Sequence, residues 1–132
     1  MKLSREADEW QTQLVWENRK LEAYMSSPVV IDGNGYLLLK NQRFCCFDLE
    51  TGKERWRSKK SFGKYWSLVT QGDRILALDE TGDLRMIRAN SEQLEIIDQR
   101  KISNSPTWAH LAAAGEHLFV RELDALVAYR WK

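Results

Sequence analysis

The sequence is poor in the features that define several large classes of protein. Its 132 residues include only two prolines and two cysteines, and the cysteines are neighbours, Cys45 and Cys46. Adjacent cysteines cannot join distant strands in an ordinary disulfide, so a disulfide framework is excluded. No histidine or cysteine partners stand at zinc-ligand spacing, so a structural zinc site is not supported either.

The chain also lacks an excess of charge of either sign. It has 20 basic and 19 acidic residues, for a net charge of +1. Strong non-specific binding to nucleic acid requires clustered positive charge, so we expect no nucleic-acid partner. No apolar run approaches the roughly 20 residues that span a bilayer, and we expect no membrane span. Residues 1–9 lack the apolar core of a secretory signal, so the sequence leaves the cellular location open.

What the chain does have is an internal repeat. Three apolar stretches end in turns at Gly33, Gly72 and Gly115, which lie roughly 40 residues apart. Each glycine is followed by a second β-like run and, after a polar turn, by a third. This period, with about four short strands per unit, is typical of propeller blades. We therefore predict one all-β domain over residues 1–132, with blades at about 27–58, 65–100 and 107–131.

The fourth strand of each unit indicates how the blades would be completed. The first unit supplies it with Lys53–Arg57 and the second with Leu94–Asp98, but the third reaches Lys132 without one. A spare strand is expected near the N-terminus, at about residues 12–18, where Trp16 occupies a place similar to that of Trp56. The sequence predicts that this strand completes the last blade.

The turn between the third and fourth strands of the first unit carries a specific motif. Its defining residues are Asp48, Thr51, Gly52 and Trp56. Asp48 and Thr51 can bond the turn backbone, and Gly52 supplies a positive φ. This stretch resembles the repeat of the pyrroloquinoline-quinone (PQQ)-like propellers, with Cys46 where alanine is usual. The second unit lacks the Thr-Gly pair and the tryptophan.

The resemblance extends over about residues 13–131 and implies a propeller of a family that is often periplasmic or secreted. It favours the family's non-enzymatic scaffold proteins of bacterial envelopes over its quinoprotein dehydrogenases. Propellers close with roughly four to eight blades, so three blades form only half of a ring. The matching spare and missing strands favour a six-bladed homodimer, in which each N-terminal strand completes the partner's last blade. The alternative is a C-terminal fragment of a longer propeller with no independent function.

The sequence offers no catalytic, cofactor-binding or metal-binding residues, and we expect no cofactor. Cys45 and Cys46 lie mid-strand, where neighbouring side chains point to opposite faces, which favours blade packing. We predict a non-catalytic scaffold or a module that binds protein or ligand, with a PQQ-dependent oxidoreductase fragment as the alternative. The candidate ligand-binding mouth lies where the chain leads into the second and third blades, at Phe62, Lys64, Tyr65, Trp66, Trp108 and His110. Core packing is the alternative role for these side chains.

Overall fold

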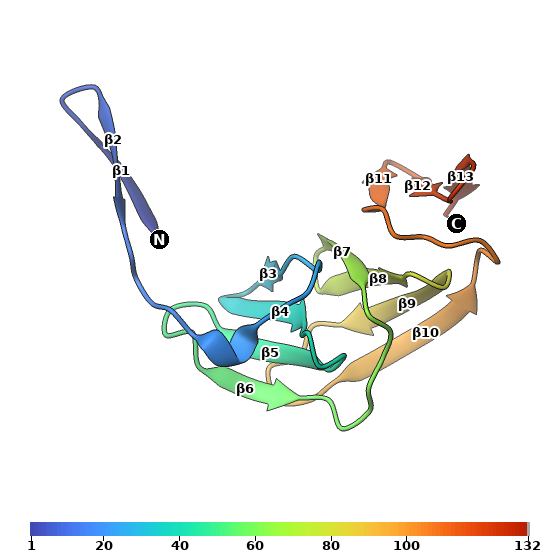
Figure 1. Cartoon of the computed structure of the whole chain (residues 1–132), viewed down its shortest axis with the longest axis horizontal. Coiled ribbons are helices and arrows are strands. Elements are labelled where there is room, and N and C mark those ends of the chain that lie inside the picture. The colour runs from blue at the N-terminus through green and yellow to red at the C-terminus, as the bar shows by residue number, and fades with distance from the viewer. Residues whose placement is uncertain (132) are drawn as a thin grey trace.

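Each repeat folds into one antiparallel sheet in the computed structural model of the protein, which describes residues 1–131 (Figure 1). Blade 1 consists of β3–β6 (Val29–Ile31, Asn34–Leu38, Phe44–Asp48 and Glu54–Arg57). Blade 2 consists of β7–β10 (Trp66–Gln71, Arg74–Asp79, Asp83–Arg88 and Glu95–Lys101). Blade 3 consists of β11–β13 (Ala112–Ala114, His117–Arg121 and Leu126–Arg130). The all-β half-propeller is therefore confirmed.

Tight turns set the register of the first two strands in every blade. In blade 1, Asp32 and Gly33 form the turn between β3 and β4, with φ values of 49° and 72°. Two positive φ values in a two-residue loop match the twist of the strands that it joins. The equivalent turns of blades 2 and 3 contain Gly72 and Gly115, which also have positive φ. The repeating glycines of the sequence thus mark the hairpins.

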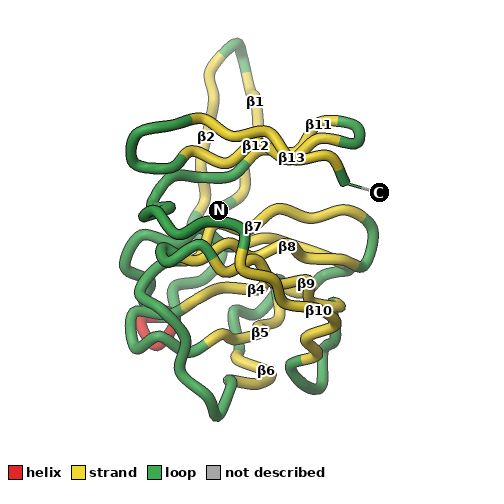
Figure 2. Tube along the Cα trace, turned by 90° about the vertical axis from the view of Figure 1, so that its right-hand side faces the viewer, coloured by secondary structure: helices red, strands yellow, loops and turns green. Residues whose placement is uncertain are grey.

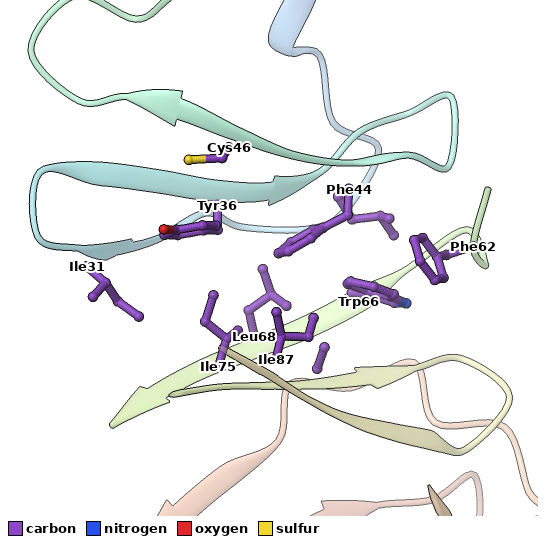
Figure 3. Packing of buried hydrophobic residues seen from close by; sticks show 11 residues of the cluster. Ile31, Tyr36, Phe44, Cys46, Phe62, Trp66, Leu68, Ile75 and Ile87 are labelled. Carbon is purple, nitrogen blue, oxygen red and sulfur yellow. The ribbon is translucent and has the colours of Figure 1, made fainter. Parts of the chain in front are cut away.

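The core lies in the seams, the boundaries between neighbouring blades. Blade 2 covers one face of blade 1, and Trp16, Leu21 and Ala23 cover the other, so consecutive residues of β5, from Phe44 to Phe47, are all buried. In the blade 1–2 seam, blade 1 contributes Tyr36 and Phe44 and blade 2 contributes Trp66 and Ile75 (Figure 3). The blade 2–3 seam is built from aliphatic side chains, namely Leu78, Leu84, Leu111, Leu118 and Val120. Viewed from the side, the three blades stack in chain order (Figure 2).

The prediction of a strand over residues 12–18 is wrong. β1 (Lys2–Glu6) and β2 (Glu9–Gln13) pair with each other in a hairpin that projects away from the blades (Figure 1). Residues 14–18 follow without strand pairing, and the three-residue helix η1 (Arg19–Leu21) comes next. The physical reason is that Trp16 docks onto blade 1, at the opposite end of the stack from β13. Within one chain, this segment therefore does not complete blade 3.

Trp16 nevertheless contacts blade 1 much as Trp56 contacts blade 2. The indole N–H of Trp16 donates to the Leu49 carbonyl at 2.9 Å, and that of Trp56 donates to the Asn90 carbonyl at 2.8 Å. Each acceptor lies just after the third strand of the blade that receives the indole. A Cβ at Gly52 would lie 2.5 Å from Cε3 of Trp16, so glycine is needed there for close approach as well as for its φ of 69°.

Blade 3 differs from the other two blades in having three strands in the described chain. β13 pairs with β12 on one side only. The face of blade 3 that points away from blade 2 is open to solvent, with Ala128 exposed and Leu126 72% exposed. Within residues 1–131, the structure contains no helix of the length and hydrophobicity that a bilayer crossing requires.

Candidate functional site

The segments that lead into the first strand of each blade come together on one side of the molecule. Tyr24 and Met25 precede β3, Lys64 precedes β7 and Trp108 precedes β11. With the turn between β4 and β5, these segments line a hollow of about 530 Å³. We call it the mouth hollow, and its lining consists of Tyr24, Met25, Lys40, Gln42, Lys64 and Trp108.

Three of the six predicted mouth residues belong to this hollow or support it. Lys64 and Trp108 line it directly, and Trp108 keeps 38% of its surface exposed. Tyr65 lies behind Trp108, with the ring centroids 5.9 Å apart and the ring planes 23° apart. Burial raises the pKa of the Tyr65 phenol, so this ring stays neutral and acts as a support for the Trp108 indole.

Phe62 and Trp66 instead belong to the core of the blade 1–2 seam, the alternative role weighed from the sequence. Their ring centroids lie 4.6 Å apart, and Trp66 is fully buried. The Arg85 guanidinium lies over both rings, 5.5 Å from the Phe62 centroid and 5.3 Å from that of Trp66. Such cation–π contacts hold the arginine between the rings. Neither ring is available to a ligand in the mouth hollow.

His110 is exposed but belongs to a structural hydrogen-bond pair. Its Nδ1 lies 3.0 Å from Ser67 Oγ, which also accepts a hydrogen bond from the Leu111 backbone N–H at 2.8 Å. The serine thereby ties the segment before β11 to β7. His110 does not line the mouth hollow, so the structure does not bring it together with Lys64 and Trp108.

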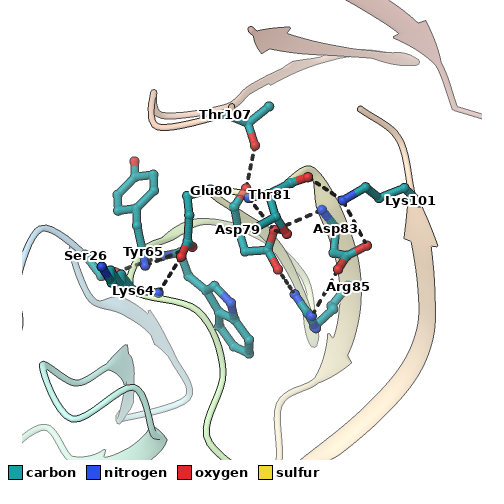
Figure 4. A network of polar contacts seen from close by, with 11 residues as sticks. Ser26, Lys64, Tyr65, Asp79, Glu80, Thr81, Asp83, Arg85, Lys101 and Thr107 are labelled. Carbon is teal, nitrogen blue, oxygen red and sulfur yellow. Dashed lines mark hydrogen bonds and ion pairs between the residues drawn. The ribbon is translucent and has the colours of Figure 1, made fainter. Parts of the chain in front are cut away.

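Glu80 positions two of the lead-in segments, and sequence analysis missed it. Its carboxylate accepts hydrogen bonds from the backbone N–H groups of Lys64 at 2.7 Å and Tyr65 at 3.2 Å (Figure 4). Its backbone carbonyl accepts from Thr107 N–H at 3.0 Å. On the other side, Ser26 Oγ accepts from the backbone N–H of Trp66. The walls of the hollow are therefore held by hydrogen bonds even though they are loops.

Asp79 anchors the turn that carries Glu80. One carboxylate oxygen accepts from the backbone N–H and hydroxyl of Thr81 and from Asp83 N–H, and the other accepts from Arg85 at 2.7 Å (Figure 4). Burial would raise the pKa of Asp79, but the hydrogen bonds from Arg85, Asp83 and Thr81 outweigh it, and this pKa lies below its ordinary value. Asp79 and Arg85 thus form a buried ion pair between the mouth hollow and the core.

The motif residues of blade 1 stabilise a turn at the other end of the strands. Thr51 donates both its backbone N–H and its hydroxyl to Asp48, at 2.8 and 2.9 Å, and Arg55 pairs with the same carboxylate at 2.6 Å. The N–H of Thr51 and its hydroxyl hold the pKa of Asp48 below its ordinary value. These residues shape the turn that receives Trp16, and they do not reach the mouth hollow.

The remaining lining residues were also missed from the sequence, although the repeat contains the signal. Tyr24 and Met25 lie about one repeat before Lys64 and Tyr65. The prediction considered the segments that lead into blades 2 and 3 but not the one that leads into blade 1. Lys40 and Gln42 come from the turn between β4 and β5, and nothing in their local sequence distinguishes them from other turn residues.

The side chains present do not fit a bound quinone cofactor with its calcium ion. Within residues 1–131, no three His, Cys, Asp or Glu side chains gather closely enough to hold a metal. Cys45 and Cys46 are both free and buried, with Cys46 in the blade 1–2 seam and Cys45 on the opposite face of the sheet. Burial raises the pKa of Cys45 to about 12 and also raises that of Cys46. The pair packs the blade.

Comparison with known proteins agrees with this architecture. No known family and no curated protein matches the chain. Among solved structures, the chain is similar to BamB from Moraxella catarrhalis, with a TM-score of 0.55 and 14% identity over 82% of this chain and 43% of that one. The shared fold is a β-propeller. The chain spans less than half the length of the matched BamB structure, and at this identity the half-propeller shares its fold alone.

Proposed function

We propose that the half-propeller is a non-catalytic binding module that holds an acidic, aromatic-rich protein segment in the mouth hollow. The observation that carries the proposal is the composition of the lining. Tyr24 and Met25 remain 63% and 52% exposed, beside the partly exposed Trp108. Exposed aromatic and thioether groups that cluster in one concave surface are typical of protein-binding sites.

The charge of the hollow favours an acidic partner. Lys40 and Lys64 both line it. Lys40 pairs with Glu22 at 2.8 Å, but both side chains are largely exposed, so a ligand carboxylate can replace this partner at little cost. No described residue forms an ion pair with the Lys64 ammonium. The hydrogen bonds of Glu80 and Ser26 fix the backbone around Lys64, which lowers the entropy lost on binding.

The experiment uses a blocked, fluorescently labelled heptapeptide in which glutamate alternates with phenylalanine. We expect saturable binding that weakens as salt is added, because the attraction between exposed charges is screened. Lys64→Glu and Trp108→Ala should each weaken binding about tenfold or more, which corresponds to about 1.4 kcal/mol. Lys53→Glu, on the exposed turn after β5, is the matched charge control and should leave binding unchanged.

The proposal fails if the peptide does not bind, or if Lys64→Glu and Lys53→Glu weaken binding equally. It also fails if a peptide with lysine in place of glutamate binds as tightly. Tight binding of the lysine peptide would mean that attraction to Lys40 and Lys64 does not hold the ligand in the hollow.

We further propose that the half-propeller pairs with a second copy of itself. Trp16 docks on blade 1 as Trp56 of the outer strand β6 docks on blade 2, so residues 14–18 occupy the place of the outer strand of a blade that would precede blade 1. They pair with no third strand of the described chain. Within residues 1–131, β13 is a third strand without an outer partner. The two vacancies lie at opposite ends of the stack, so a second copy can fill both, and two sets of three blades fall within the range of closed propellers.

A further inference from the structure

The two seams of the molecule are built on the same plan, which allows their contents to be compared position by position. In blade 1, Tyr36 of β4 lies directly opposite Cys46 of β5. In blade 2, Leu76 of β8 lies directly opposite Met86 of β9. Each pair belongs to the face that its blade presents to the next blade. Leu76 is therefore the counterpart of Tyr36.

Aromatic rings fill this position in the blade 1–2 seam. Tyr36 is 2% exposed, and its ring stacks against Phe44 with a centroid distance of 6.3 Å. Trp56 lies opposite Cys46 in the outer strand and closes the seam over Tyr36, with the ring centroids 6.3 Å apart. The phenol and the indole together fill this part of the seam.

Both rings are missing from the blade 2–3 seam. Leu76 stands where blade 1 has Tyr36. The residue opposite Met86 in β10 is Asp98, because the ladder shifts between Ile96 and Asp98. Asp98 is exposed and bonds Arg100, so it does not fill the seam. A hollow of about 390 Å³ results, which we call the seam hollow. Its main apolar walls are Val69, Leu76, Met86, Ala113, Leu118 and Trp131.

The seam hollow is open to solvent, and its lining is mainly apolar, with Thr70, Gln71, Arg74 and His117 as the polar members. It reaches the surface between the turns at Gly72 and Gly115, both of which are exposed. The Met86 thioether and the Trp131 indole both favour contact with an aromatic ring over contact with an aliphatic one. Apolar cavities in proteins can take up small aromatic molecules such as benzene.

We propose that the seam hollow is a binding site for a small, uncharged aromatic ligand with one ring, of the phenol class. The side chain of Tyr36, at the equivalent position one seam away, is the template for this ligand. The site is separate from the mouth hollow and shares none of its lining residues. If no aromatic ligand binds the seam hollow, the proposal that the mouth hollow binds a protein segment still stands.

The experiment titrates the protein with p-cresol, which is the side chain of tyrosine without its backbone. Binding is followed by chemical-shift changes of the Met86 methyl group and the Trp131 indole N–H. We expect saturable binding of one molecule per chain. Cyclohexanol, which has a similar size but no aromatic ring, should bind about tenfold more weakly. Blocked tyrosine amide tests whether the ring can also enter when it carries a peptide backbone.

Two variants fill the seam hollow from opposite walls. Leu76→Tyr places a phenol ring where blade 1 has Tyr36, and Ala113→Leu narrows the hollow from β11. If one variant fails to fold, the other still tests the proposal. Each should weaken p-cresol binding about tenfold or more. Ile97→Tyr, at an exposed position outside the lining, is the control and should not change binding. The proposal is overturned if p-cresol shows no saturable binding, or if both folded filling variants bind it as the unmodified chain does.

Discussion

At the scale of single residues, the chain uses one arrangement of aspartate, threonine and arginine twice. Asp48 accepts from the backbone and hydroxyl of Thr51 and pairs with Arg55, and Asp79 accepts from the backbone and hydroxyl of Thr81 and pairs with Arg85. The two sites differ in exposure. The Asp79 and Arg85 side chains are 4% and 8% exposed, against 25% and 42% for Asp48 and Arg55.

This difference predicts unequal effects of the same substitution. Asp79→Asn leaves the buried Arg85 guanidinium with only the more distant Asp83 carboxylate, at 3.7 Å, and breaking a buried ion pair typically costs about 3–5 kcal/mol. Asp48→Asn removes a partly exposed charge that solvent screens, so it should reduce the free energy of unfolding much less. Urea denaturation of the two variants measures both values. Equal losses would mean that burial does not govern the Asp79–Arg85 pair.

Acid should lower the stability of the folded chain through the Asp79 carboxylate. The pKa of Asp79 in the folded chain lies below the 3.8 of the free side chain. A lowered pKa adds stability above the unfolded value, and this contribution is lost as the pH falls through the folded value. The free energy of unfolding should therefore decrease below about pH 4. The slope should be shallower in Asp79→Asn, and an unchanged slope would contradict the assignment.

At the scale of strands and turns, the sequence predicted the three hairpins better than it predicted their outer strands. The hairpins could be predicted because a glycine with positive φ and an apolar run on either side suffice to define them. The outer strands contain irregularities of register that no local signal reveals. One of them makes Asp98, rather than Ile97, the structural counterpart of Trp56. The seam hollow follows from that shift.

The same scale explains why the predicted N-terminal strand was wrong. The sequence likeness between Trp16 and Trp56 was real, but a tryptophan of this kind contacts the following blade as well as its own. For Trp16 the following blade is blade 1, and the tryptophan docks on it. Within the described residues, no third strand pairs with residues 14–18 to form the blade of which they would be the outer strand. Of the candidate site, Lys64 and Trp108 could be predicted from their place in the repeat. Phe62 and Trp66 could not be separated from the core, because their burial depends on side chains from other strands, such as Phe44 and Arg85.

Docking of Trp16 can be measured in the single chain. Trp16→Phe keeps an aromatic ring beside Phe47 but loses the hydrogen bond to the Leu49 carbonyl, which should cost about 1 kcal/mol. Trp16→Ala also loses the packing on Gly52 and should cost about 3 kcal/mol. Trp10 is 70% exposed in the hairpin, so Trp10→Ala is the control and should change stability by less than about 0.5 kcal/mol. If all three variants unfold alike, the segment is not docked.

At the scale of the whole molecule, the open edge of β13 decides how the blades can be completed. In blade 1, the Phe44 carbonyl accepts from Ser58 N–H and the Asp48 N–H donates to the Lys53 carbonyl. The backbone polar groups of alternate β5 residues are therefore directed toward the outer strand. Their counterparts in β13 are Leu126, Ala128 and Arg130. Trp131 N–H donates to the Glu116 carbonyl on the β12 side, which leaves the N–H of Ala128 directed outward. A sheet edge with free donors of this kind is a template for an added strand.

The proposed pairing of two copies therefore predicts a specific sensitivity to proline. Light scattering should give a mass of about 31 kDa, twice the 15.5 kDa of one chain. Ala128→Pro removes the outward N–H while keeping the bonds to β12, as proline at a sheet edge does, and should shift the protein toward the monomer. Ala128→Val retains the N–H and should remain a dimer. A monomer for the unmodified chain at all concentrations, or a dimer that withstands Ala128→Pro, would show that residues 14–18 of a second copy do not add to β13.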